Sequence, residues 1–371
     1  MKIELKKTGR YSFPTGVMDI ALQNDEARII AACMGGLYGL DIPPRDDDDL
    51  KPQPYELGQH TSYVSSVRLS ADGAKMYSAS YDGSFHLREL KPDSRQSITP
   101  QLQVPMHSFW SWQMTHSPDG QWCVSASGQY LAGAEDYSPL PSPEPTIKLI
   151  EANSGNLRHA WNLLPPVQCV AIDAQGKHVA AANLMGDIAI YNIDSGAELA
   201  KWRTPNFTSW GIIKSHCYIG GIFAISFAPD GESLYVAGMG DMRDPMAGNG
   251  KQLWQRFAWK KNPAEKLQES HADDTGEGLM EALEFHPSGE FFAMAGRLRG
   301  GNWNVGFFDT STGRLIGQAK TGMRITSIRF TPDGHVAFFG GMQGQPGIHN
   351  GVFPDFGYIE RFAITEIDSV A

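Results

Sequence analysis

One short phrase recurs along the chain and constrains its fold more than any other feature. It joins an alternating apolar stretch, a turn rich in Pro, Asp and Gly, and a second apolar stretch, as in "SIRFTPDGHVAFFGG" at 327–341. A degenerate copy of the turn, "QNDE" at 23–26, precedes six clear ones. The clear turn glycines are spaced 45 to 58 residues apart, at Gly73, Gly120, Gly176, Gly231, Gly289 and Gly334. Recurrence at this period indicates a repeat architecture.

The apolar residues before each turn alternate with a period of two, which is typical of β-strands because successive side chains point to opposite faces. The position six residues before the turn glycine is always apolar. It holds Ile20, Val67, Met114, Val170, Ile225, Leu283 and Ile328. The position four residues before is apolar except for His116, which we expect to be a partly buried histidine with satisfied hydrogen bonds. We therefore expect each turn to close a hairpin, with glycine at positive φ.

A second hairpin signal lies out of phase with the first. It appears as "EANSGNL" at 151–157, "NIDSGAEL" at 192–199 and "DTSTGRL" at 309–315. Two hairpins in one unit require four antiparallel strands. The chain is therefore predicted to be all-β and built from seven four-stranded units, although a pair of β-sandwiches or a β-helix remain alternative folds.

Seven such units resemble a β-propeller of the WD40 and related YVTN-type families, with degenerate repeats. The resemblance covers essentially the whole chain. The second unit comes nearest to the family signature, with Gly58, His60, Ser80 and Asp82, while Arg88 stands near the position of the family's tryptophan. It implies one seven-bladed domain over 1–371. The expected blades are approximately 14–57, 58–104, 105–163, 164–204, 205–270, 271–320, and 321–365 together with 1–13.

The two ends of the chain are expected to complete the last blade together. After the last turn glycine, Gly334, only two further strands can be found, at 335–341 and 357–364. The stretch before the first unit, at 3–13, is in surplus. Pairing this stretch with the last blade would close the ring and cover both exposed strand edges, which otherwise promote aggregation.

Composition narrows the possible partners and compartments. The formal net charge is −10 and no basic stripe is visible, so we expect no nucleic-acid partner. "RDDDDLK" at 45–51 is predicted to be a solvated loop. The N-terminus lacks a secretory signal and no apolar run could span a bilayer, so a cytoplasmic protein without membrane contact is expected. The scattered cysteines predict neither disulfides nor a zinc finger, and the first three are expected in the core: Cys33, Cys123, Cys169 and Cys217.

Function is expected on one rim of the ring. Connections between the second and third strands, and between blades, carry the extra length, at 129–145, 239–250, 297–302, 343–356, 205–221 and 271–278. Aromatic and arginine side chains there are typical interface anchors. The candidates are Trp110, Tyr130, Tyr137, Trp210, Tyr218, Arg243, Arg297, Arg299, Trp303 and Phe353. The resemblance implies a non-catalytic scaffold that binds partner proteins, possibly within a larger complex, and requires no cofactor.

An alternative is a propeller enzyme of the metal-dependent lactonase or hydrolase kind, or a sensor of a small ligand. Acidic and histidine side chains on the same expected rim could hold a divalent metal across the central channel. These candidates are Asp241, His271, Asp273 and His349. The sequence contains no phosphate-binding loop, nucleophile elbow or metalloprotease helix motif, which favours the scaffold over the enzyme.

Overall fold

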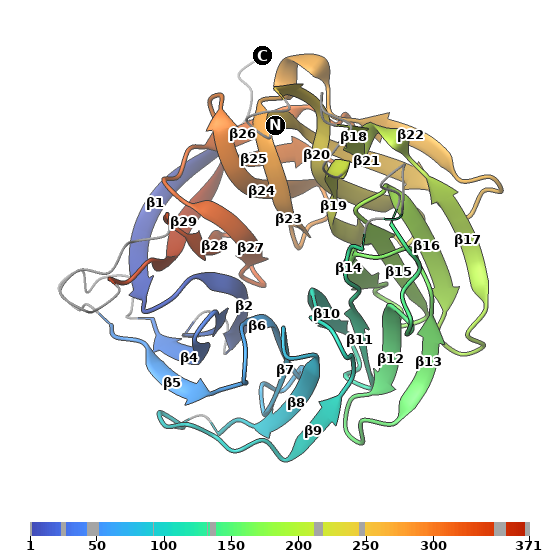
Figure 1. Cartoon of the computed structure of the whole chain (residues 1–371). Helices are drawn as coiled ribbons and strands as arrows, with labels where there is room; N and C mark the ends of the chain where they lie inside the picture. The colour runs from blue at the N-terminus through green and yellow to red at the C-terminus, as the bar shows by residue number, and fades with distance from the viewer. Residues whose placement is uncertain are drawn as a thin grey trace.

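The computed structural model describes residues 2–23, 27–42, 52–91, 93–131, 133, 139–210, 218–244, 249–344 and 354–367. Apart from two short 3-10 segments, η2 (Pro205–Phe207) and η3 (Ala272–Asp274), the regular structure in these residues is β. The sheets stand around a common axis, with one strand of each nearest to it (Figure 1). The predicted all-β fold of the propeller type is thereby confirmed.

Four antiparallel sheets each follow the chain order from the axis outward, and we refer to each four-stranded unit as a blade. The first contains β2 (Val17–Gln23), β3 (Arg28–Cys33), β4 (Gly36–Asp41) and β5 (Tyr55–Gly58). The second contains β6 (Val64–Leu69), β7 (Lys75–Ser80), β8 (Ser84–Glu89) and β9 (Leu102–Pro105). The third contains β10 (Gln113–His116), β11 (Trp122–Ala126), β12 (Ile147–Glu151) and β13 (Leu157–Trp161). The fourth contains β14 (Val167–Ile172), β15 (His178–Asn183), β16 (Asp187–Asn192) and β17 (Glu198–Arg203).

The next nine strands form one larger sheet. Its first part comprises β18 (Thr208–Trp210), β19 (Tyr218–Phe227), β20 (Leu234–Asp244), β21 (Asn249–Ala258) and β22 (Glu265–Glu269). Its second part comprises β23 (Glu277–Phe285), β24 (Phe291–Gly300), β25 (Val305–Asp309) and β26 (Leu315–Ala319). A single residue pair, Lys251 with Glu277, joins β21 to β23. Division of the sheet at this pair gives a fifth and a sixth blade.

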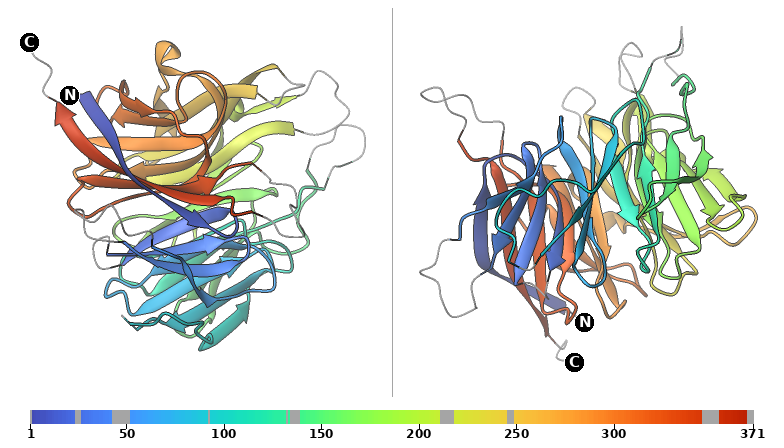
Figure 2. Two further views of the ribbon diagram at one scale, coloured as in Figure 1. Left: turned by 90° about the vertical axis from the view of Figure 1, so that its left-hand side faces the viewer. Right: turned by 90° about the horizontal axis from the view of Figure 1, so that it is seen from below.

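The two ends of the chain share the remaining sheet. Its order is β1 (Lys2–Phe13), β29 (Gly357–Ile367), β28 (Val336–Met342) and β27 (Arg324–Phe330). β1 runs antiparallel to β29 from the pair Lys2–Ile367 to the pair Phe13–Gly357. The two strands lie side by side and bring the termini together (Figure 2). The N-terminal stretch therefore pairs where the sequence analysis expected it to pair.

The turn glycines adopt the backbone conformation that the sequence predicted. Gly73 and Gly334, in the first hairpin of their units, have φ of 68° and 74°. Gly155 and Gly313, in the second hairpin, have φ of 74° and 70°. Side chains with a Cβ atom rarely adopt these angles, so glycine recurs at both turns of the repeat.

The core lies between neighbouring sheets. The position six residues before the turn glycine is buried in every unit, from Ile20 to Ile328. The cysteines Cys33, Cys123 and Cys169 are buried and free, as expected, and burial raises the pKa of each thiol. His116 is half-buried, with both ring nitrogens within hydrogen-bond distance of backbone carbonyls, as predicted. Cys217 and the acidic run at 45–49 lie outside the described residues.

The inner strands of neighbouring blades are joined by a repeated hydrogen bond from a backbone N–H to a side chain. The acceptor always lies seven residues before the turn glycine and the donor six residues before the next one. The bonds run from Ile20 N to Ser327 Oγ (3.3 Å), Val67 N to Asp19 Oδ2 (3.1 Å), Met114 N to Ser66 Oγ (2.9 Å) and Val170 N to Gln113 Oε1 (2.9 Å). The first of these joins the last blade to the first.

Two expected loops are partly strands. β20 and β21 continue to Asp244 and from Asn249, so most of 239–250 extends the hairpin of the fifth blade. Their pairing register breaks twice along this extension, after Met239 and after Met242. β24 likewise continues to Gly300 and pairs with the start of β23. The sequence analysis placed loops here because these segments lengthen the connection between the second and third strands, but backbone pairing can continue without side-chain alternation.

Candidate binding site at the channel mouth

The inner strands carry a β-bulge at one position of the repeat. In β6 the pairing register breaks between Val64 and Ser66, and β2, β14, β19, β23 and β27 break at the equivalent place. A bulge leaves one residue unpaired and redirects its side chain. That residue lies eight positions before the turn glycine, and in the third blade the position falls just before β10. The seven residues are Met18, Ser65, Trp112, Gln168, Phe223, Glu281 and Thr326, and all of them line one cavity.

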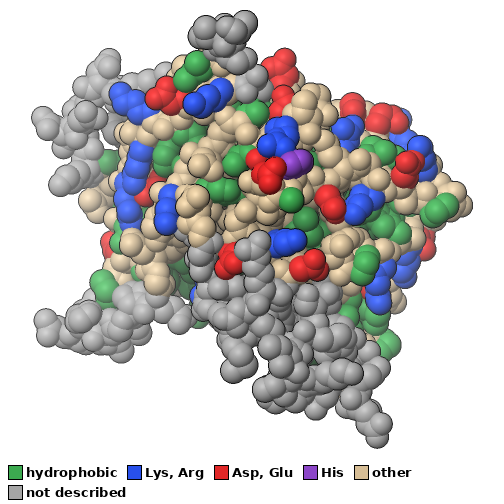
Figure 3. All heavy atoms as spheres, turned by 90° about the horizontal axis from the view of Figure 1, so that it is seen from above, with side chains coloured by type: hydrophobic (Ala, Val, Ile, Leu, Met, Phe, Trp, Pro, Cys, Tyr) green, Lys and Arg blue, Asp and Glu red, His purple; other side chains and the backbone are tan. Residues whose placement is uncertain are grey.

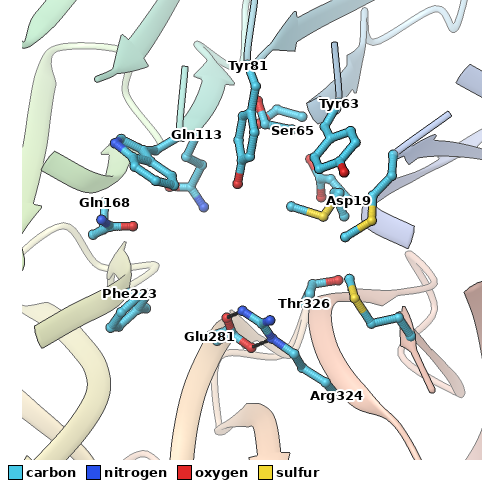
Figure 4. A pocket seen from close by; sticks show the side chains of 15 residues that line it. Asp19, Tyr63, Ser65, Tyr81, Gln113, Gln168, Phe223, Glu281, Arg324 and Thr326 are labelled. Atoms are coloured by element: carbon cyan, nitrogen blue, oxygen red, sulfur yellow. Dashed lines mark hydrogen bonds and ion pairs between the residues drawn. The ribbon is translucent and has the colours of Figure 1, made fainter. Parts of the chain in front are cut away.

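This cavity, of about 240 Å³, opens at one end of the axial channel, and we call it the channel mouth. Its bulge residues and their neighbours surround an open centre (Figure 4). Connections between strands add Met34, Tyr63 and Tyr81 to the wall, and the end of β28 adds Met342. A second cavity of about 160 Å³ shares Asp19, Gln113, Glu281 and Thr326 with the mouth, so the channel continues inward from it.

Five aromatic side chains gather at one side of the mouth, and we call them the aromatic patch: Tyr63, Tyr81, Phe109, Trp110 and Trp112. Trp110 stacks on Tyr81 with ring centroids 4.7 Å apart and an interplanar angle of 4°. Trp112 meets Trp110 edge to face at 5.2 Å. Tyr63 and Trp110 remain 47% and 41% exposed. Stacking fixes these rings while leaving apolar surface free.

A charged pair faces the patch across the mouth (Figure 4). Arg324, on β27, donates from Nε and Nη2 to the two carboxylate oxygens of Glu281, on β23. The Glu281 side chain is 10% exposed and that of Arg324 is 44% exposed. The hydrogen bond with Glu281 raises the pKa of Arg324. The arginine therefore presents a permanent positive charge to the opening.

A second charged cluster lies deeper in the channel. Asp19 binds Arg68 from the second blade and Arg329 from the last blade, the latter from Nη2 to Oδ1 at 2.9 Å. Burial alone would raise the pKa of Asp19, but the two arginines, the Val67 N–H and the Ser327 hydroxyl lower it below its usual value. Asp19 is thus a buried carboxylate whose charge is stabilised by two neighbouring blades.

The second blade contains a buried polar network around His60. Its Nε2 lies 2.9 Å from Ser78 Oγ and its Nδ1 lies 3.0 Å from Ser84 Oγ. Asp82 accepts the Ser84 hydroxyl at 2.6 Å and the Thr61 N–H at 2.9 Å. Ser80, which the sequence analysis assigned to this signature, instead accepts the Asp82 N–H through its hydroxyl. The serines that contact the histidine are Ser78 and Ser84.

Arg88 completes this network from the position where the resemblance would place a tryptophan. It is 1% exposed, and its guanidinium donates to Ser78 Oγ (3.1 Å), to the Gln59 carbonyl (2.8 Å) and to the Ile98 carbonyl (3.0 Å). Burial lowers the pKa of Arg88 to about 10, so it stays charged at neutral pH. The planar guanidinium replaces the indole as the group that fills this space.

The residues predicted from the sequence as interface anchors fall into different places. Trp110 lies in the aromatic patch, Tyr130 is half-buried beyond β11, and Arg297 is exposed on β24. Trp303 is 4% exposed and packs edge to face on Phe308, so its ring is a core side chain and cannot act as a surface anchor. Trp210, Tyr218, Arg243 and Arg299 lie on strands whose side chains there are not described. Tyr137 and Phe353 lie outside the described residues.

The structure does not support the metal-binding alternative at those of its candidate ligands that it describes. His271 and Asp273 are exposed, and the neighbouring Asp274 accepts the Leu315 N–H of the outer strand β26, away from the channel. Asp241 is exposed on β20, and His349 lies outside the described residues. Among the residues that the structure describes, no group of three or more His, Cys, Asp or Glu side chains could hold a metal.

The outer side of the ring carries charges of both signs. On the side at the top of Figure 1, acidic and basic side chains are interspersed among the described residues (Figure 3). Lys260 and Glu232 form one exposed pair there. Exposed pairs of this kind contribute little to stability.

Several residues of the mouth were missed from the sequence, among them Tyr63, Tyr81, Gln168 and Arg324. For Gln168 the signal lay in the repeat itself. The position eight residues before the turn glycine varies from methionine to tryptophan to glutamate, while the position two residues later is always apolar. A variable position two residues before one that is always apolar is typical of a side chain that does not pack in the core.

Comparison with models of protein families matches part of the chain. Residues 52–88, which include the outer strand β5 of the first blade and most of β6 to β8 of the second, match the family model of the WD40 repeat, described as WD domain, G-beta repeat. No curated protein matches the chain at a significant level. Among the described residues, no helix is long and apolar enough to cross a membrane. The chain thus contains a WD40 repeat within an all-β fold of the propeller type.

Proposed function

We propose that this chain is a non-catalytic scaffold that binds partner proteins at the channel mouth and the adjoining aromatic patch. Domains built from WD40 repeats generally mediate protein–protein interactions and are typically non-catalytic, and the chain contains one such repeat. This similarity supports the kind of function. The position of the binding surface is argued from the geometry of the mouth.

The observation that carries the proposal is the exposed stack of Trp110 on Tyr81 beside an open cavity. Tryptophan, tyrosine and arginine dominate the energetic centres of protein interfaces, and all three lie here. Each ring is held by its neighbours before any partner arrives, so binding orders few side chains. Tyr63, exposed at the edge of the patch, lies with its ring tilted at 43° to that of Tyr81, at a centroid distance of 5.9 Å, and extends the same surface.

The test compares two double variants in affinity capture from an extract of the native host. Tyr63→Ala with Trp110→Ala removes the exposed part of the aromatic patch. Leu157→Ala with Leu267→Ala removes apolar side chains of similar exposure, 59% and 45%, from the outer strands β13 and β22. We expect the first variant to recover at least about tenfold less partner than wild type, and the second to recover as much.

Circular dichroism and thermal melting of both variants verify that each is folded. A folded patch variant that captures its partners at the wild-type level contradicts the proposed surface. Loss of capture in the outer-strand variant alone would place the partner on the circumference of the ring.

A further inference from the structure

We propose that the channel mouth recognises a carboxylate side chain, of an aspartate or glutamate, in an exposed segment of the partner protein, with Arg324 as its charged contact. This inference rests on the proposed function and names the chemistry of the group that enters the mouth. It follows from which hydrogen-bonding groups around the cavity are already engaged and which are not.

The carboxylates that line the channel mouth have their oxygens occupied. Both oxygens of Glu281 accept from Arg324. Asp19 Oδ1 accepts from the Ile20 N–H, the Ser327 hydroxyl and Arg329, and Oδ2 accepts from the Val67 N–H and Arg68. A carboxylate offers about four acceptor positions, so Asp19 is saturated. Glu281 accepts only from Arg324, so a cationic ligand would have to share this carboxylate with the guanidinium that already pairs with it.

The donors of the same cavity are available. Arg324 uses Nε and Nη2, and its Nη1 has no partner among the described residues. Gln113 accepts a backbone N–H through Oε1, which leaves its NH₂ group unengaged, and the Gln168 amide makes no hydrogen bond within the described part of the chain. The Tyr81 hydroxyl is likewise free there, and burial raises its pKa to about 12, so it keeps its proton.

The aromatic rings do not reverse this preference. Rings attract cations through their π faces, but only weakly at exposed sites. A cation in the mouth would also approach the positive charge of Arg324 and would have to compete for Glu281. An acceptor meets a charged donor and neutral donors together, and hydrogen bonds to charged groups are stronger than neutral ones. The mouth therefore favours an anionic acceptor.

The size and surroundings of the cavity favour a side chain of a partner protein over a free metabolite. At about 240 Å³ the mouth is smaller than the pockets of roughly 300–1,000 Å³ that enclose whole small ligands. It also opens directly onto Tyr63 and Trp110. A single carboxylate side chain fits within the mouth, while the residues beside it would pack on the aromatic patch.

The experiment selects phage-displayed random twelve-residue peptides on the full chain. The most enriched peptide is then synthesised with its acidic residue intact and as the matching amide, and binding is measured by fluorescence anisotropy. We expect the enriched peptides to share an Asp or Glu next to an apolar residue, and the amide copy to bind at least about tenfold more weakly. Enrichment of Lys or Arg, or equal binding of the amide copy, overturns the inference.

Variants of the protein locate the contact. Arg324→Gln should weaken binding of the acidic peptide at least about tenfold. The double variant Glu281→Gln with Arg324→Gln should weaken it as much, and this variant leaves neither charge of the pair without its partner. Arg314→Gln is the matched control, because the Arg314–Asp274 pair has side-chain exposures of 46% and 12% against 44% and 10% for Arg324 and Glu281. Unchanged binding to both folded Arg324 variants overturns the inference.

Two further measurements separate the possible failures. Glutarate alone, titrated by calorimetry, should bind far more weakly than the peptide, and equal affinity would identify a free acid as the ligand and overturn the inference. If the selected peptides lose binding to the Tyr63→Ala and Trp110→Ala variant but do not need their carboxylate, the inference fails while the proposed function stands. If they bind that variant unchanged, the proposed surface fails as well.

Discussion

The hydroxyl of Ser327 donates a hydrogen bond to Asp19 Oδ1 at 2.8 Å, although the two residues are 308 positions apart in the sequence. Ser327 belongs to the last blade and Asp19 to the first. The same carboxylate accepts from Arg329 in the last blade and from Arg68 in the second. The buried side chain of Asp19, in the first blade, therefore contacts both the last blade and the second blade.

Replacement of Asp19 by Asn should destabilise the fold strongly. The amide removes the charge that compensates Arg68 and Arg329, and breaking a buried ion pair by removal of one partner costs about 3–5 kcal/mol. Urea denaturation at pH 7 gives the free energy of unfolding. Asp273→Asn, at an exposed carboxylate, is the control and should be neutral. An Asp19→Asn protein as stable as wild type contradicts this role.

Deletion of residues 2–13 should expose the edge of β29 and lower the melting temperature by about 10 °C, or cause aggregation. The deletion removes the buried side chains of Ile3 and Phe13 and the contacts of Lys7 and Arg10 with Glu360. Glu4→Ala, at an exposed position of β1, should melt as wild type does. Differential scanning calorimetry and light scattering provide the readouts; a truncated chain that melts like the full one refutes the pairing of the two ends.

Arg88→Lys should destabilise the second blade by about 2 kcal/mol. A lysine ammonium cannot reach Ser78 Oγ and the Gln59 and Ile98 carbonyls, which the guanidinium fork serves in different directions, so buried acceptors lose their donors. Arg158→Lys, at an exposed position of β13, is the matched control. Chemical denaturation at pH 7 gives the free energy of unfolding of the two lysine variants. Equal stability of Arg88→Lys and Arg158→Lys would contradict the role of the guanidinium network.

Acidification below pH 6.5 should destabilise the protein through buried neutral histidines. Burial, together with Lys148, lowers the pKa of His107 to about 4, and burial with His60 and Arg88 lowers that of His86 to about 3. Unfolded histidines take up protons near pH 6.5, so between pH 6.5 and about 4 only the unfolded state is stabilised by protonation. Each histidine then contributes a loss of about 1.4 kcal/mol per pH unit.

His107→Gln should reduce this slope, whereas His271→Gln, at an exposed site, should not. Asp19 acts in the same direction only in more acidic solution, because its lowered pKa lies below the value of about 3.9 for an unfolded aspartate. Free energies of unfolding measured at pH 7, 6 and 5 cover the pH range in which protonation of the unfolded histidines lowers stability. A stability that stays constant from pH 7 to pH 5 is incompatible with buried neutral imidazoles.

The repeat frame was predictable because it reflects local backbone chemistry. Turn glycines such as Gly73 and apolar positions such as Val67 recur with each blade, since each blade repeats the same hairpin and the same contact with its neighbour. The partnership of the N-terminal stretch with the last blade followed from counting strands. Trp110 was proposed because tryptophan is a typical anchor of protein interfaces.

The site was only partly predictable because bulges and burial depend on tertiary structure. Gln168, Phe223 and Glu281 sit inside β-strands, and only the shifted register directs them toward the axis. Trp303 occupies a glycine-rich connection that resembles an exposed loop, yet it folds back onto Phe308. Arg324 is held at the mouth by its hydrogen bonds to Glu281, which lies 43 positions earlier in the sequence and on another blade.

Site-specific photocrosslinking tests the central claim most directly. A benzoylphenylalanine is placed at position 63, in the aromatic patch, or at position 157, on the outer strand β13, and the protein is irradiated in extract of the native host. The account predicts that position 63 forms a crosslink to a partner protein and that position 157 does not. Crosslinks from position 157 with none from position 63 would contradict the assignment of the channel mouth as the binding surface.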